Sequence, residues 1–128
     1  MVRLGRMMQF SGEISHRLNR ARVLANYSAG IVARQQLCDA DFILVTASRY
    51  HGFPAGYPCP VCESEELRQV YWVYGDALGK GSATARSVEE IERFAVEGKV
   101  FRMHTVEVCP DCRWNHLLKE VTVSWQAD

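Results

Sequence analysis

The chain has 128 residues, of which 48% are hydrophobic and 23% are charged, and its formal net charge is zero. This composition is ordinary for a globular protein, so disorder over the whole chain is not expected. The length predicts one domain, or one small domain with an attached helical arm. No apolar run approaches the ~20 residues that a membrane helix needs. Residues 1–6 lack the features of a secretory signal, so we expect a cytoplasmic protein.

The charge is unevenly distributed along the chain. Residues 1–38 contain six arginines and one acidic residue, a net charge of +5. Residues 39–128 contain nine basic and fourteen acidic side chains, a net charge of −5. A basic N-terminal part could meet phosphate or an acidic protein surface. The alternative is that its arginines pair with the acidic part of the same molecule.

The N-terminal part is predicted to be helical. Residues 8–27 are expected to form one helix because four apolar side chains fall on a single helical stripe; they are Ile14, Leu18, Ala21 and Ala25. A short helix is expected over residues 31–38, and another over residues 42–50 with Asp39 or Asp41 as its N-cap. Glycine and proline residues within 51–58 then predict a linker.

The C-terminal part combines strands with one helix. A loop is expected over residues 75–86, followed by a helix that begins with a capping box formed by Ser87 and Glu90 and stops at Gly98. Aromatic and β-branched residues, with alternation of apolar and polar side chains, predict three strands. These strands cover residues 67–74, 100–108 and 117–125.

Four of the five cysteines form two C-P-x-C pairs. Cys59 and Cys62 make the first pair, Cys109 and Cys112 the second. Two cysteines at this spacing in a tight turn can both reach one zinc ion, and proline after the first cysteine favours the turn. Each pair adjoins a predicted strand, as in a zinc ribbon. The 46 residues between the pairs exceed the usual spacing, which we attribute to an insertion over residues 75–99.

Other interpretations of these cysteines remain open. Disulfides need an oxidising compartment, and a thioredoxin-type redox pair needs a βαβ setting that the pattern lacks. A rubredoxin-like iron site uses the same four thiolates, but its knuckles usually continue with glycine, whereas Glu63 and Arg113 stand here. The fifth thiol, Cys38, is expected to be a buried helix cysteine, or else a reactive or additional metal-binding thiol.

The fold class predicted from these elements is α+β. A basic helical segment over residues 1–50 precedes a zinc ribbon over residues 51–128, whose three-stranded antiparallel sheet has a helix inserted between its first two strands. One structural zinc ion is expected as the cofactor. Four thiolates leave no open coordination position, so we expect no enzyme. His104 and His116 are candidates for hydrogen-bond donors to the thiolates or substitute ligands, or are ordinary sheet and loop residues.

The expected function is a binding module that contacts a nucleoprotein machine such as RNA polymerase or the ribosome. A basic arm and an exposed aromatic face of the ribbon would make the contact. Two alternatives are a protein–protein adaptor and a metal- or redox-responsive regulator that acts through Cys38 or a knuckle thiol. The candidate partner-binding residues are Arg17, Arg20, Arg22, Arg68 and Arg102.

Several segments resemble an uncharacterised actinobacterial family of small zinc-ribbon proteins, over roughly residues 12–125. They are Cys59-Pro60-Val61-Cys62, Val73-Tyr74-Gly75-Asp76, Cys109 to Leu117, Cys38-Asp39-Ala40 and Arg49-Tyr50-His51-Gly52. The resemblance implies four cysteine ligands and an actinobacterial cytoplasm, and it supplies no activity. The ribbon is more distantly similar to those of transcription and translation factors, a likeness of fold alone.

Overall fold

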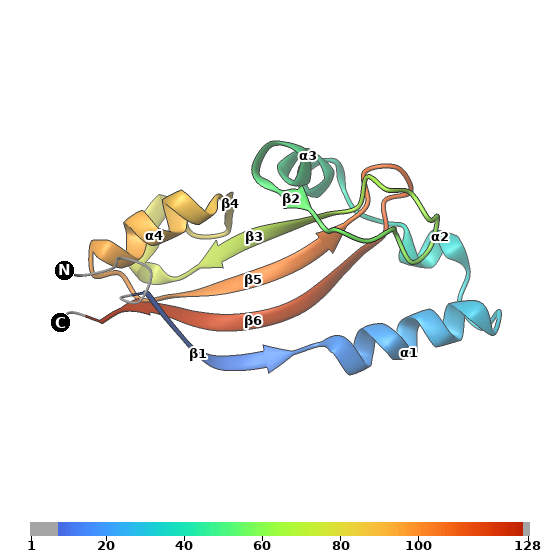
Figure 1. The fold of residues 1–128 in the computed structure, drawn as a ribbon, viewed down its shortest axis with the longest axis horizontal. Coiled ribbons are helices and arrows are strands. Elements are labelled where there is room, and N and C mark those ends of the chain that lie inside the picture. Colours follow the sequence, from blue (N-terminus) through green and yellow to red (C-terminus); the bar gives the residue numbers. More distant parts are fainter. Residues whose placement is uncertain (1–7, 127–128) are drawn as a thin grey trace.

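The computed structural model describes residues 8–126 (Figure 1). The strands are β1 (Met8–Ser15), β2 (Phe53–Pro54), β3 (Arg68–Tyr74), β4 (Thr84–Arg86), β5 (Phe101–Val108) and β6 (Asn115–Trp125). The helices are α1 (Arg17–Ser28), α2 (Arg34–Leu37), α3 (Phe42–His51) and α4 (Val88–Val96), with a 3-10 helix η2 (Asp76–Gly81). Helices and an antiparallel sheet occur together, so the α+β class is confirmed.

The sheet is larger than the sequence predicts. It has six strands. Five follow the order β1-β6-β5-β3-β2, and β4 pairs with a different part of β3 than β2 does. The three predicted strands are present as β3, β5 and β6 and lie side by side, but the expected three-stranded sheet is wrong because three further strands extend it. Figure 1 shows α4 at one end of the sheet, and α2 with the connecting loops at the opposite end.

The prediction of a single helix over residues 8–27 is also wrong. Residues 8–15 form β1, which pairs antiparallel with β6 from Met8 opposite Trp125 to Ser15 opposite Lys119. This pairing gives backbone partners to an edge of β6 that would otherwise be open. The helix begins at Arg17, and its expected buried stripe faces outward, since Leu18 is 84% exposed.

The remaining helical predictions fare unevenly. The second helix shrinks to the single turn α2, whereas α3 and its cap are confirmed, because the Leu44 amide donates to Asp41 Oδ1 at 2.8 Å. The capping box of α4 is confirmed by reciprocal hydrogen bonds between Ser87 and Glu90. The region predicted as a loop over residues 75–86 contains η2 and β4, so that prediction is wrong in part.

Three apolar clusters hold the elements together. One lies under α4, where Ile91 and Ala95 pack with the ends of β5 and β6. A second joins α3 to Val70 and Val108, on β3 and β5. The third surrounds the cysteines and contains Leu67 and Trp114, with partly buried residues of α1 packed against it.

The predicted division at residue 50 has strands on both sides of it. β1 belongs to the range 1–50 and β6 to the range 51–128, yet the two strands are paired.

Arg3 and Arg6, counted in the basic segment, lie outside the described residues. Among residues 8–126, the helices are all too short or too polar to cross a membrane.

Candidate metal centre

Two loops at one end of the sheet carry the C-P-x-C pairs. The first loop lies between β2 and β3, and the second connects β5 directly to β6. In the first loop, the Cys59 amide donates to Ser64 O and the Glu63 amide to Cys59 O, both at 2.9 Å. The second loop repeats this pattern at 2.8 Å, with Cys109 bonded to Trp114 and Arg113. Both pairs therefore adopt the same backbone knuckle.

The residue after each pair has a left-handed backbone. Glu63 has φ 65° and Arg113 has φ 73°, a region that glycine enters at least cost. The knuckles thus take the same turn without glycine at these positions. Lack of glycine after the cysteines, used above to argue against a rubredoxin-like iron site, therefore does not separate iron from zinc.

The four paired thiols converge on one point. Their Sγ atoms all lie within 4.8 Å of one another. Cys59 and Cys112 are 3.7 Å apart, and Cys62 and Cys109 are 3.6 Å apart, so sulfurs from different knuckles meet. All five cysteines are free thiols in this structure. The predicted ligand set is thus gathered at one place, where it could hold a metal ion.

The spacing fits a tetrahedral ion. Ligands about 2.3 Å from a central zinc are separated from one another by about 3.8 Å in a tetrahedron. The measured distances of 3.6 and 3.7 Å lie close to that value. Backbone amides also point at the sulfurs: Val61 N lies 3.4 Å from Cys59 Sγ, and Trp114 N lies 3.4 Å from Cys112 Sγ. These amides would stabilise thiolate charge.

The pKa values of the four thiols indicate which protons a metal ion would have to displace. Burial raises the pKa of Cys59 and of Cys109 to about 11, and that of Cys112 to about 12. Burial acts in the same direction on Cys62, but the Ser64 amide and the neighbouring thiols outweigh it and lower the Cys62 pKa. Without metal, Cys59, Cys109 and Cys112 would hold their protons at neutral pH, so metal uptake would release them and weaken as pH falls.

Beside the cysteines, hydrogen bonds and an ion pair converge on a buried carboxylate that the sequence did not reveal. Glu107 on β5 is 0% exposed and accepts hydrogen bonds from Arg20 Nε at 3.0 Å and Trp114 Nε1 at 2.7 Å. The Tyr57 hydroxyl donates to the same carboxylate. Trp114 also packs against the cysteines, so the network connects α1 to the four-cysteine cluster. The sequence did contain one signal for this network: Glu107 stands at a position of the predicted strand where alternation places side chains toward the core.

The two candidate histidines bond elsewhere in the described residues. His104 Nε2 lies 3.4 Å from Glu120, and its ring centroid lies 4.6 Å from that of Tyr74. The His116 ring stacks on Trp114 with centroids 5.7 Å apart, and its Nδ1 lies 2.7 Å from Leu117 O. His116 therefore borders the residues around the cysteines, whereas His104 lies on the open sheet.

The five candidate arginines divide into two groups. Arg17 and Arg22 are exposed on α1. The other three bond within the molecule: Arg20 to Glu107, Arg68 to the carbonyls of Ser48 and Gly52, and Arg102 to Gly12 O and Thr122. Of the five candidates, Arg17 and Arg22 are therefore the two that are exposed to solvent.

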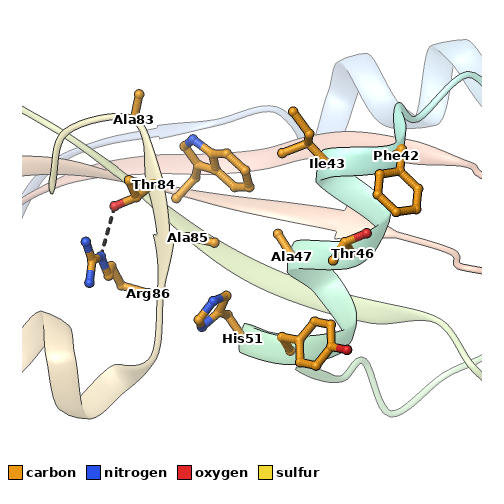
Figure 2. Close-up of a pocket in the computed structure, with 11 residues that line it drawn as sticks. Phe42, Ile43, Thr46, Ala47, His51, Ala83, Thr84, Ala85 and Arg86 are labelled. Atoms are coloured by element: carbon orange, nitrogen blue, oxygen red, sulfur yellow. Dashed lines mark hydrogen bonds between the residues drawn. The ribbon is translucent and has the colours of Figure 1, made fainter. Parts of the chain in front are cut away.

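An open apolar groove lies apart from the cysteines, between α3 and β4. Figure 2 shows side chains of both elements facing it, and its volume is about 530 Å³. Three of its α3 residues are strongly exposed, namely Phe42 (81%), Ile43 (69%) and Tyr50 (80%). The groove was not predicted from the sequence. One of its two walls is β4, and β4 lies in a segment that was expected to be a loop.

Comparison with known proteins places the chain in a family. Residues 7–127 match the model of a family of unknown function, DUF5318. The uncharacterised proteins Mb0050 of Mycobacterium bovis and Rv0049 of Mycobacterium tuberculosis are 40% identical to it over 106 residues. Each match covers 83% of this chain and 77% of the relative. No solved structure matches. The chain therefore belongs to the DUF5318 family, an uncharacterised family with mycobacterial, and hence actinobacterial, members.

Proposed function

We propose that this protein is a non-enzymatic binding module whose knuckle-bearing end is a zinc ribbon holding one structural Zn²⁺. The observation that carries the proposal is the meeting of four thiols from two equivalent knuckles at zinc spacing. Cys59, Cys62, Cys109 and Cys112 are the ligands. A zinc ion with four thiolates has a complete shell and offers no position to a substrate or an activated water. A structural role follows from that closed shell.

The ion would act as a staple between distant parts of the chain. It would connect the loop that leads into β3 with the turn between β5 and β6. The strands themselves pair along that end, with Arg68 opposite Val108. Among the described residues, Leu67 and Trp114 are the only fully buried side chains that join Cys59 and Cys109 in this cluster, so a small core of this kind would gain much of its stability from a bound metal.

Metal removal tests this role. We expect the purified protein to contain one zinc per chain, and Cys109→Ser to lose most of it. A strong chelator should lower the midpoint of the thermal unfolding transition that the metal-bound protein shows by circular dichroism. Cys38→Ser is the matched control, and it should keep the metal. A Cys109→Ser protein with full zinc content and native stability would contradict the proposal.

The proposed partner is a nucleic-acid-containing complex such as RNA polymerase or the ribosome. Support comes from Arg17 and Arg22, which are exposed on a helix with no acidic residue in its first turn. Phosphate contacts of this type give affinity that falls steeply with salt. We expect the double variant Arg17→Ala, Arg22→Ala to weaken binding to ribosomes or RNA polymerase, whereas Arg93→Ala on α4 should not. Salt-insensitive binding, or none, would contradict this assignment.

A second candidate function, a protein–protein adaptor, is favoured by the groove between α3 and β4. It is lined by strongly exposed apolar side chains, Phe42, Ile43 and Tyr50, and exposed apolar surface of this kind marks protein contacts. The occupant would be an apolar segment of another protein. Association that survives nuclease treatment and is lost in Phe42→Ala would favour the adaptor. Association that disappears with nuclease would favour the nucleic-acid complex.

A further inference from the structure

The fifth cysteine lies against the four-thiol cluster. Cys38 Sγ is 3.6 Å from Cys112 Sγ, as close as the sulfurs of Cys62 and Cys109 are to each other. Cys38 therefore belongs to a group of five thiols and is not an isolated one. Because four thiolates complete the shell of a zinc ion, one of the five has no place in the shell. That thiol is Cys38, which lies outside the two knuckles.

Specific hydrogen bonds hold Cys38 in this position. The Ala40 amide donates to Arg113 O at 3.0 Å, and Arg113 Nε donates to Ala40 O at 2.6 Å. Asn115 Nδ2 donates to Asp39 Oδ1 at 2.9 Å. Asp39 and Ala40 are thus hydrogen-bonded to residues at the end of the second knuckle. These bonds hold Cys38 beside Cys112, although 73 residues separate the two cysteines in the sequence.

Cys38 and Cys112 also share access to solvent. Both thiols line a surface hollow of about 570 Å³, together with Arg34 and Arg113. Cys59 and Cys109, in contrast, are 1% and 0% exposed. A small oxidant in the hollow would meet the Cys38–Cys112 pair. A free thiol beside an accessible ligand sulfur is the arrangement of a redox-sensitive pair.

We propose that Cys38 and Cys112 form a reversible disulfide under hydroperoxide oxidation, and that this bond opens the metal site. The inference rests on the proposed zinc function. The Cys112 thiolate attacks one peroxide oxygen, which breaks the O–O bond and gives a sulfenic acid and hydroxide. Cys38 Sγ then attacks the Cys112 sulfur, the S–O bond breaks, and its proton leaves with the hydroxyl group as water. The two sulfurs lose two electrons in total, which reduce one peroxide.

The consequence for the site follows from ligand count. A disulfide-bonded Cys112 is no longer a thiolate, so only three ligands remain and zinc binding weakens. A thiol reductant reverses the bond by exchange and restores the fourth ligand. Cys38 thus acts as a resolving thiol, and its role differs from that of the four ligands.

Hydrogen peroxide is the probe for the test. Zinc content is first measured in the untreated protein; zinc release is then followed with a chromogenic chelator, and disulfides are mapped by mass spectrometry. We expect a Cys38–Cys112 disulfide that appears together with zinc release and is reversed by dithiothreitol. In Cys38→Ser we expect a sulfenic acid at Cys112 that a diketone reagent traps. Release should be about tenfold slower, because a Cys112 sulfenate can still coordinate the ion and no resolving thiol is present to convert it to a disulfide. Gln35→Ala, in the same hollow, should behave as the native protein.

The possible outcomes separate the inference from the proposed function. A zinc-containing protein whose disulfide joins Cys59 to Cys62 or Cys109 to Cys112 overturns the inference alone. Equal release rates in the native protein and Cys38→Ser also overturn it. A protein purified without metal contradicts the proposed function instead, and the disulfide map of that protein still shows whether Cys38 and Cys112 pair.

Discussion

Glu107 is a buried carboxylate on β5 that faces both α1 and the cysteine cluster. A charge removed from water is tolerated when ion pairs and hydrogen bonds compensate it, and here Arg20, Trp114 and Tyr57 all bond to it. The Arg20–Glu107 pair also joins the basic N-terminal part to the acidic remainder of the chain. At this position the arginine contributes to the fold and is not free for a partner.

Removal of the Arg20 side chain tests whether the fold depends on its ion pair with Glu107. In Arg20→Ala the Glu107 charge stays buried without its counter-ion, so we expect the free energy of unfolding to fall by about 3–5 kcal/mol. Urea denaturation of the metal-bound protein measures the change. Arg17→Ala, one turn earlier in α1 and exposed, serves as the control and should change stability by less than about 0.5 kcal/mol. Equal effects of the two substitutions would contradict the role given to Glu107.

His104 provides a prediction about pH. Burial lowers the His104 pKa, and nearby Arg102 acts in the same direction although Glu120 opposes both. The folded protein therefore binds fewer protons at this site than the unfolded chain does below about pH 6.5. Its stability should fall as pH drops below that value, and His104→Gln should make this fall shallower. An NMR titration midpoint of the His104 ring at or above pH 6.5 would refute the prediction.

Sequence spacing was sufficient to predict that the four paired cysteines converge, but not to predict which residues lie beside them. Each C-P-x-C pair is local, so its knuckle follows from a few residues, and two knuckles beside strands predict convergence. Cys38 and Glu107 gain their roles from contacts across 74 and 87 residues. Such contacts depend on how α1 and α2 return to the sheet, which no local pattern encodes. Cys38 was expected to be a buried helix cysteine, with a reactive or additional metal-binding thiol as the alternative; in the structure it is half-buried and lies just after α2. Its place beside Cys112 required the fold.

Among the elements, α4 was the best predicted because its signals are local. Ser87 accepts from the Glu90 amide at 3.3 Å, and the Glu90 side chain accepts from the Ser87 amide at 3.1 Å. The bond to Ser87 and the Arg86 guanidinium also lower the Glu90 pKa. The capping box and the spacing of the apolar residues predict the same helix. Its existence and its first residue could therefore both be predicted from the sequence.

Loss of the cap should be measurable. We expect Ser87→Ala to lower the free energy of unfolding by about 1 kcal/mol, because the first turn of α4 loses its side-chain acceptor. Chemical denaturation followed by circular dichroism gives the value. Ser28, exposed at the end of α1, provides the comparison, and Ser28→Ala should be close to neutral. A neutral Ser87→Ala would show that α4 does not need this cap.

The error at β1 has a physical cause. Residues 8–15 alternate apolar and polar side chains, with Met8, Phe10 and Ile14 on alternate positions, but Ile14 also fits the helical stripe that continues to Ala25. The strand is favoured because β6 has a long edge to pair with. A register shift between Ser11 and Ile14 includes Gly12, whose φ of +58° suits glycine. Pairing between the two ends of the chain decided the structure.

In the whole molecule, the four-cysteine cluster and the apolar cluster under α4 lie toward opposite ends of the sheet (Figure 1). The apolar cluster under α4 stabilises one end of the sheet, and the knuckles lie near the other, where α2 and the connecting loops gather (Figure 1). In the proposed account zinc closes that second end, and the groove at α3 and the exposed arginines of α1 remain available to partners. Loss of the metal should then loosen the knuckle end first, while α4 stays packed.

The central claim is that four cysteine sulfurs share one zinc ion, and X-ray absorption at the zinc edge of the purified protein tests it most directly. The account predicts one zinc per chain with four sulfur neighbours at about 2.3 Å. Nitrogen or oxygen atoms in the shell, fewer than four sulfurs, or iron in place of zinc would contradict it.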